Sequence, residues 1–245
     1  MANLKKRDII KTRDIDIRNF LYSIILKEYK NDPGTRIINE FSNGASGYGA
    51  RIDVAVINES INGYEIKSDR DNLQRLPKQI ELYSKAFDKI TIISGKVHID
   101  RIMNLVPECW GVIEVLDGKD KIEDFVNIRK AEDNKFIDAY SVSQLLWENE
   151  ALELLARHNL LKGLSNKTIT TLWKEIADNI PLKGIQEFVR LKLKSSFRPL
   201  SARFYRRDTP TGIRYDYRCF GVVISEGTEG GYEYWSHCHH REGEA

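Results

Sequence analysis

Two short runs of strand-forming residues, separated by a tight turn, constrain the fold of this chain most. Residues 51–60 (RIDVAVINES) and 64–68 (YEIKS) are rich in β-branched and aromatic residues, and residues 61–63 (ING) between them are typical of a tight turn. Strands joined this closely pair as an antiparallel hairpin, which brings the neighbourhood of Asp53 next to Glu65. The sequence therefore predicts a sheet built around this hairpin.

Helix and strand patterns follow one another on both sides of the hairpin. Apolar residues recur at three- and four-residue intervals in the predicted helices, and the predicted strands are short β-branched runs. The order up to residue 116 is αβββαβαβ, in which an antiparallel start is continued by helix-connected strands. This order predicts an α/β fold, or a mixed α+β sheet, with helices on the faces of the sheet. Besides the hairpin, the predicted helices are residues 12–30, 71–88 and 99–107, and the predicted strands are 35–41, 89–95 and 110–116.

The character of the chain changes after residue 117, which predicts four segments. Residues 1–117 would form the core, and the polar residues 118–140 would form extension strands and a linker. Residues 141–198 would form a mainly helical module, and residues 199–245 a basic segment that ends in a β-hairpin. The three helices expected in the module are residues 141–160, 165–180 and 181–197.

Composition limits the cellular setting. The 245 residues are 41% hydrophobic, which is enough for a substantial core. No apolar run approaches the roughly 18 residues of a membrane span, and the first residues lack the apolar middle of a secretory signal. The scattered Cys109, Cys219 and Cys238 suit a reducing compartment better than a disulfide framework. We therefore expect a cytoplasmic protein without a membrane partner.

Three charged residues of the hairpin form the candidate site. Glu65 and Lys67 are two residues apart in a strand and so project to the same face. Asp53 stands in an otherwise apolar strand, where aspartate is depleted. Two neighbouring carboxylates raise one another's pKa unless a cation lies between them, and Mg²⁺ or Mn²⁺ would remove the repulsion. The alternative is a half-exposed hairpin with a weak surface ion pair.

The spacing of these residues resembles a known nuclease motif. Asp53, eleven intervening residues and Glu65-Ile66-Lys67, followed by a helix and another strand, resemble the PD-(D/E)XK nuclease superfamily. Residues 51–93 are similar, more narrowly, to the bacterial sce7726 family of predicted nucleases within it. The resemblance covers residues 35–95 well and the remainder weakly, and Ile52 stands where the motif has proline. It implies a restriction-endonuclease-like core, αβββαβ.

The resemblance also implies a reaction. Asp53, Glu65 and the backbone carbonyl of Ile66 would hold Mg²⁺ or Mn²⁺, and Lys67 would orient or activate a water. The protein would then be a metal-dependent endonuclease that hydrolyses phosphodiester bonds of DNA, in phage defence or in a mobile element.

Three further residues could support the site. Gln79 and Tyr83 match the QxxxY element of RecB-like and Cas4-like members and share a helical face. The alternative is that Tyr83 is a core residue and Gln79 a surface residue. Glu40 would be an additional acidic metal ligand, or an ordinary glutamate at a strand edge.

Basic residues gather between residues 183 and 218. Ten basic residues stand against three acidic ones, a local excess of seven. Such an excess attracts a polyanion, here DNA, with RNA not excluded. The alternative is a solvated helix face followed by a mobile loop. The residues predicted to contact nucleic acid are Lys183, Arg190, Lys192, Lys194, Arg198, Arg203, Arg206 and Arg207.

Two other functions fit the same residues. One is a non-catalytic nucleic-acid-binding module of a larger complex, and the other is a Holliday-junction-type resolvase, which would need a dimer. The intact set of Asp53, Glu65 and Lys67 favours the nuclease, because degenerate members of the superfamily usually lose one of these residues. A homo-oligomer or a partner protein is left open.

Overall fold

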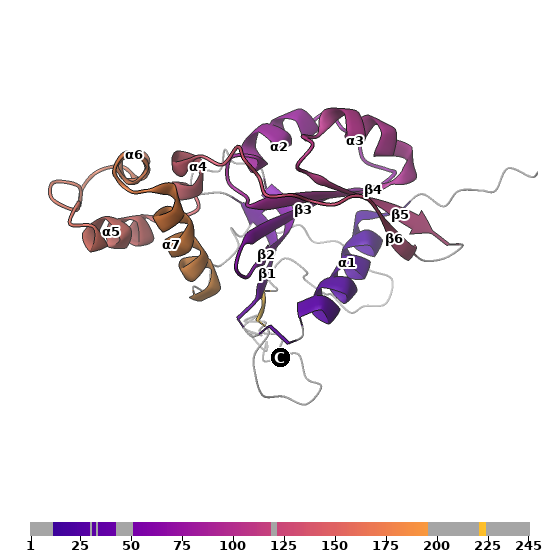
Figure 1. The fold of residues 1–245 in the computed structure, drawn as a ribbon, viewed down its shortest axis with the longest axis horizontal. Coiled ribbons are helices and arrows are strands. Elements are labelled where there is room, and N and C mark those ends of the chain that lie inside the picture. Colours follow the sequence, from indigo (N-terminus) through magenta and orange to yellow (C-terminus); the bar gives the residue numbers. More distant parts are fainter. Residues whose placement is uncertain are drawn as a thin grey trace, which may run out of the picture.

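The computed structural model describes residues 12–29, 31–32, 34–42, 51–118, 122–195 and 221–223. These residues form an α/β protein in which helices cover both faces of a mixed sheet, and a helical region follows it in sequence (Figure 1). The predicted α/β class and mixed sheet are confirmed. The predicted terminal hairpin lies outside the described residues, apart from residues 221–223.

The sheet contains six strands between residues 36 and 129, and a three-residue strand extends it at one edge. The first three strands are antiparallel, the next two continue in parallel, and the sixth turns back antiparallel. The order across the sheet is β6-β5-β4-β3-β2-β1-β7. The strands are β1 (Arg36–Ser42), β2 (Arg51–Ile57), β3 (Ile61–Lys67), β4 (Lys89–Gly95), β5 (Gly111–Asp117), β6 (Ile122–Arg129) and β7 (Gly221–Val223).

Helix α1 lies on one face of the sheet, and α2 and α3 lie on the other (Figure 1). The face of α1 that carries Ile17, Leu21 and Ile25 packs against apolar residues of the sheet that include Val54 and Ile66. These α1 residues recur every four positions, which places them on one stripe of the helix. The helices are α1 (Asp14–Tyr29), α2 (Leu76–Tyr83), the 3₁₀ turn η1 (Lys96–His98), α3 (Ile99–Leu105), α4 (Ala139–Ser143), α5 (Glu148–Arg157), α6 (Ile169–Asn179) and α7 (Leu182–Ser195).

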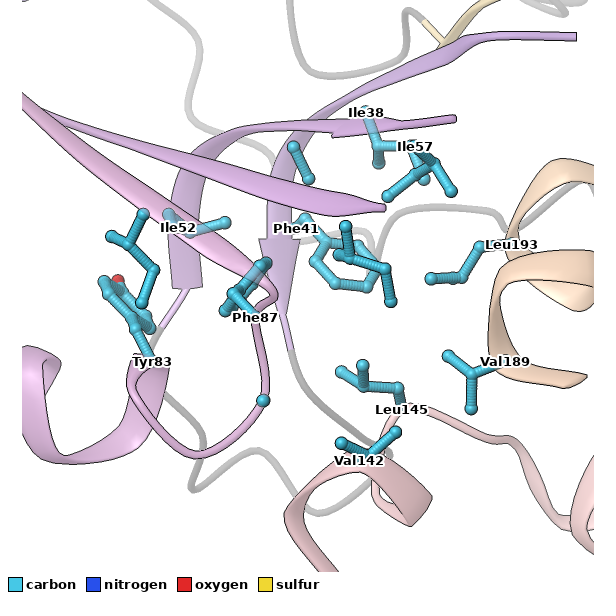
Figure 2. Close-up of a cluster of buried hydrophobic side chains, with 14 of the residues drawn as sticks. Ile38, Phe41, Ile52, Ile57, Tyr83, Phe87, Val142, Leu145, Val189 and Leu193 are labelled. Carbon is cyan, nitrogen blue, oxygen red and sulfur yellow. The ribbon is translucent and has the colours of Figure 1, made fainter. Parts of the chain in front are cut away.

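The helical region shares its core with the sheet. Figure 2 shows Phe41 of β1 and Phe87, just before β4, in one cluster of buried side chains with Val142, Leu145 and Leu193 of the helical region. Helices α4 to α7 therefore pack onto the sheet through buried apolar surface. The predicted division of the chain at residue 117 stays a prediction.

Helix α7 ends against β1. Arg36 donates to the carbonyl of Leu193 at 2.8 Å, which satisfies one of the carbonyls that a helix leaves unpaired in its last turn. Gln186, earlier in α7, donates to Asp88 at 2.8 Å. On the edge of β1 that faces away from β2, Gly221 of β7 pairs with Ile38. The chain therefore leaves α7 beside β1 and returns to β1 at β7.

Two predicted boundaries differ from the structure because local hydrogen bonds compete with the apolar pattern. The predicted helix 71–88 is shorter, since α2 begins only at Leu76. Pro77 follows in its first turn, where a missing N–H costs little. The Ser68 backbone N–H donates to Asp71 at 2.7 Å, which forms a local turn before the helix. The predicted turn 61–63 belongs to β3, and the chain reverses at residues 58–60.

The predicted helix 141–160 is two helices, α4 and α5. Leu145 and Leu146, between them, are fully buried. The chain is then extended at Trp147, whose backbone N–H donates to the Glu150 carboxylate at 2.9 Å. This contact marks the beginning of a new helix, α5, because the Glu150 side chain accepts from a backbone N–H that has no acceptor within the helix. Among the described helices, none is long and apolar enough to cross a bilayer, and the cytoplasmic location stays a prediction.

Candidate functional site

Three neighbouring strands bring acidic residues into one row. Val54 of β2 pairs with both adjacent strands, and one residue further along Asp53 lies between Glu40 of β1 and Glu65 of β3. The hairpin register seen in the structure therefore brings Asp53 and Glu65 to adjacent positions. We call the residues around this row the polar centre; it comprises Asp14, Arg18, Glu40, Arg51, Asp53, Glu65, Lys67, Gln79 and Tyr83.

Glu65 is buried and has three side-chain partners. Its Oε1 accepts from Lys67 Nζ at 2.5 Å and from Gln79 Nε2 at 2.6 Å, and its Oε2 accepts from the Tyr83 hydroxyl at 3.1 Å. Glu65 is 2% exposed, and the Lys67 side chain 9%. The alternative of a weak surface pair is therefore wrong, because both charges are removed from solvent. Tyr83 is at once a core residue and a partner of Glu65.

Asp53 is held by a residue that the sequence reasoning missed. Arg18 of α1 donates to Asp53 Oδ1 at 2.9 Å and to the Asp53 backbone carbonyl at 2.7 Å. The Ile66 backbone N–H donates to the other carboxylate oxygen, Oδ2, at 2.7 Å. A signal was present in the sequence, because Arg18 stands three residues before Leu21 and so lies on the buried stripe of α1.

Glu40 belongs to the same network and has unusual backbone geometry. Its carboxylate pairs with Arg18 at 3.1 Å and with Arg51 at 2.7 Å. Its φ is 50°, a left-handed conformation that is uncommon for residues other than glycine. Arg18 also pairs with Asp14 at 3.3 Å, so one guanidinium bridges three carboxylates.

Burial dominates the electrostatics of the polar centre. Burial, and after it the charge of Glu65, raise the pKa of Asp53 to about 8 against the opposing effect of Arg18. Burial also raises the pKa of Glu65, although Lys67 opposes the shift. Burial and the Glu65 charge raise the pKa of the Tyr83 hydroxyl, which keeps it protonated as a donor. Ionisation of either carboxylate is therefore less favourable than it would be in water.

The donor set around the two carboxylates bears on metal binding. All four carboxylate oxygens of Asp53 and Glu65 accept hydrogen bonds from the protein. Within the described residues, no group of three or more His, Cys, Asp or Glu side chains is arranged to hold a metal ion. Gln79 Oε1, however, is buried and has no hydrogen-bond partner. Two carboxylates and this amide oxygen are the ligands that the side chains offer, and Mg²⁺ or Mn²⁺ stays a prediction.

The described basic residues of the predicted nucleic-acid surface lie on α7. Lys183 is exposed and Arg190 is partly exposed. Lys192 pairs with Glu153 at 2.5 Å, and Lys194 lies 3.9 Å from Glu59. The other predicted contacts, Arg198, Arg203, Arg206 and Arg207, lie outside the described residues.

Comparisons with known proteins point to a phage family. The family model described as Bacteriophage P4 protein cII matches residues 10–216 of this chain. Protein cII of Enterobacteria phage P4 is 27% identical over 171 residues, which are 70% of this chain and 63% of that relative. The chain thus spans less than two thirds of the length of this relative. No solved structure matches the chain.

These matches overturn the predicted family and the activity that followed from it. The matching family is the P4 protein cII family, so membership of the sce7726 family of PD-(D/E)XK nucleases was wrong. Neither match assigns a nuclease, and the predictions of a metal-dependent DNA endonuclease, of a junction resolvase and of phage defence were wrong with it. In the structure Asp53 and Glu65 each have an ion-pair partner in the protein, Arg18 and Lys67.

Proposed function

We propose a nucleic-acid-binding function for this chain, which belongs to the bacteriophage P4 protein cII family. DNA is the proposed ligand, and the polar centre would hold a divalent cation, Mg²⁺ or Mn²⁺, beside Asp53 and Glu65. The observation that carries the proposal is the buried, unpartnered Gln79 Oε1 next to Glu65, in a centre where burial raises the pKa of both carboxylates.

The chemistry of these groups supports a hard cation. A carboxylate with a raised pKa gains free energy when a positive charge comes close to it, and two such groups favour a dication. Because Gln79 Nε2 donates to Glu65, its amide oxygen remains as a neutral ligand of the type that Mg²⁺ accepts. The Ile66 carbonyl is a further oxygen at the same place in β3. A cation there would supply positive charge to which a phosphate oxygen can bind.

Lys67 gives the centre a second way to hold a phosphate. Its ammonium now pairs with Glu65 at 2.5 Å. With a cation bound beside Glu65, the Lys67 ammonium would be available to bind a backbone phosphate as a point charge.

The basic stretch between residues 183 and 218 supports a polyanionic ligand. Its excess of seven positive charges favours phosphate-rich partners. The described residues on either side of positions 196–220 both lie at β1, where Arg36 binds the Leu193 carbonyl and Ile38 pairs with Gly221. The same strand carries Glu40 of the polar centre. Leu193 at the end of α7 and Glu40 of the polar centre therefore both lie at β1, which supports a common surface.

We also propose that the core has the restriction-endonuclease-like arrangement as a fold. The order α1-β1-β2-β3-α2-β4 supports this, with an antiparallel start and a helix-connected parallel strand. Fold alone does not imply an activity.

The test is a binding measurement with the full chain. Fluorescence anisotropy of labelled single-stranded DNA, double-stranded DNA and RNA of one mixed sequence would be recorded with Mg²⁺, with Mn²⁺ and with EDTA. We expect DNA affinity to fall as salt rises, because phosphate contacts release counterions. We also expect wild-type protein to bind more tightly than Glu65→Gln in Mg²⁺ and equally well in EDTA.

A matched variant separates the polar centre from general electrostatics. Glu81→Gln removes one negative charge from the exposed side of α2, where Glu81 pairs with Lys78 and Lys85. It should bind DNA as wild type does in every buffer. No binding to any nucleic acid at low salt would refute the function. Identical affinities of wild type and Glu65→Gln in Mg²⁺ would refute the cation, and preferential RNA binding would refute DNA as the ligand.

A further inference from the structure

Arg18 already supplies a positive charge to the polar centre. Arg18 is 6% exposed, and its guanidinium contacts the carboxylates of Asp14, Glu40 and Asp53. We infer that Arg18 is an internal competitor of the divalent cation, and that it sets the affinity of the centre for that cation by occupying Asp53 Oδ1. This inference rests on the proposed cation site and adds its regulation.

The competition follows from which oxygens of Asp53 are available. Asp53 Oδ2 accepts from the Ile66 backbone N–H at 2.7 Å, a contact fixed by the pairing of β2 and β3. Asp53 Oδ1 accepts from Arg18 Nη2 at 2.9 Å. A cation that binds Asp53 must therefore take Oδ1 from Arg18 or lie beside a guanidinium of the same sign. In either case cation binding becomes less favourable, through the loss of an ion pair or through repulsion.

The surroundings of Arg18 are arranged to keep it in place. Glu40 reaches Arg18 from a backbone with φ of 50°, a strained conformation of the kind that persists where the surrounding structure enforces it. Arg18 Nη1 also donates to the Asp53 carbonyl at 2.7 Å. These contacts come from β1 and β2, so the guanidinium is held from two strands as well as from its own helix.

Asp14 is an alternative ion-pair partner for Arg18. It lies one turn earlier on α1, its side chain is 46% exposed, and it already pairs with Arg18 at 3.3 Å. A withdrawn Arg18 would point toward Asp14 and solvent, while Ile17 and Leu21 would keep α1 packed on the sheet. The apparent affinity for the cation is then the intrinsic affinity multiplied by the fraction of molecules in which Arg18 has withdrawn.

The test is a Mn²⁺ titration of the full chain by isothermal calorimetry. We expect Arg18→Gln to bind Mn²⁺ about tenfold more tightly than wild type, within the usual range of coupling between two ligands of one site. The control is Arg13→Gln on the same helix, which removes an exposed arginine that pairs with Asp16 at 2.7 Å. It should bind Mn²⁺ as wild type does.

A second variant guards against loss of the fold. Arg18→Lys keeps a positive charge but loses the planar fork that bridges several carboxylates. It should bind Mn²⁺ more tightly than wild type and less tightly than Arg18→Gln. Circular dichroism checks that each variant is folded. If Arg18→Gln does not fold, the Mn²⁺ affinity of Arg18→Lys alone tests the competition.

The outcomes distinguish this inference from the function on which it rests. If wild type binds Mn²⁺ and the folded Arg18 variants bind equally or more weakly, the competition is refuted while the cation site stands. If neither wild type nor any folded variant binds Mn²⁺, both are refuted. Tighter binding by the Arg18 variants, which Glu65→Gln abolishes, supports both.

Discussion

The ion pair between Glu65 and Lys67 gives the sharpest prediction about the polar centre. Lys67→Met keeps the length of the side chain and removes its charge. Because Glu65 is 2% exposed, its carboxylate would then be buried without a cationic partner. Removing one partner of a buried pair costs about 3–5 kcal/mol. Gln79 and Tyr83 still donate to Glu65, so we expect the lower end, about 3 kcal/mol of the free energy of unfolding.

A double substitution isolates the pairwise contribution. In Glu65→Gln/Lys67→Met neither position carries a charge, so the double variant should be more stable than Lys67→Met alone, with a coupling of about 1–3 kcal/mol. Urea denaturation followed by tryptophan fluorescence measures these values, because Trp110 and Trp173 are fully buried.

The loss should also depend on pH. Removing Lys67 raises the pKa of Glu65 further above its usual value of 4.5, since the lysine lowers it in the wild type. Protonated Glu65 carries no charge to bury, so the deficit of Lys67→Met should shrink as pH falls from 7 toward 4.

An exposed ion pair provides the control. Lys78→Met breaks the 2.8 Å pair with Glu81, whose side chains are 66% and 51% exposed. Exposed pairs contribute about 0–1 kcal/mol, so this variant should lie close to wild type. The reasoning is refuted if Lys67→Met loses less than about 1 kcal/mol, or no more than Lys78→Met.

Three further predictions concern the same core. Tyr83→Phe removes a donor to Glu65 and should lower the free energy of unfolding by about 1–2 kcal/mol in urea; an unchanged midpoint would contradict this. Gly95→Ala would place a Cβ in steric overlap with the Asp69 carboxylate, which is 7% exposed, and should cost about 1–3 kcal/mol by the same assay; a neutral result would show that Asp69 can move. Because the folded pKa of Asp53, about 8, lies above its usual 3.8, its stabilising contribution is complete below pH 3.8 and is lost as pH rises to about 8. Asp53→Asn cannot titrate, so its stability relative to wild type should increase from pH 5 to 8 in thermal denaturation; a constant difference would contradict the raised pKa.

The central strands were predictable because their signals are local. Residues 89–95 were predicted as a strand and form β4 over the same residues, since a β-branched run between two helices has few alternative structures. The beginning of α2 was not predictable from apolar spacing. Leu73 is buried although it precedes the helix, so it satisfies the apolar pattern of a helix that has not yet begun.

The candidate site was predictable where one hairpin or one helix contains it. The adjacency of Asp53 and Glu65 follows from the hairpin, and the alignment of Gln79 with Tyr83 follows from helical spacing. Arg18 was missed because it comes from α1, 35 residues before Asp53, and only the packing of α1 on the sheet brings it there. The motif contains the acids and omits the arginine that pairs with one of them.

The charges of the polar centre link the pH prediction to the proposed cation. Four carboxylates meet three basic side chains, which leaves one negative charge without a balancing partner when all are ionised. A proton on Asp53 balances the centre, which agrees with its raised pKa, and a bound cation would balance it in another way. A proton and a cation that neutralise the same excess charge compete, so Mn²⁺ should bind more tightly as pH rises toward 8. The groups counted are Asp14, Glu40, Asp53 and Glu65 against Arg18, Arg51 and Lys67.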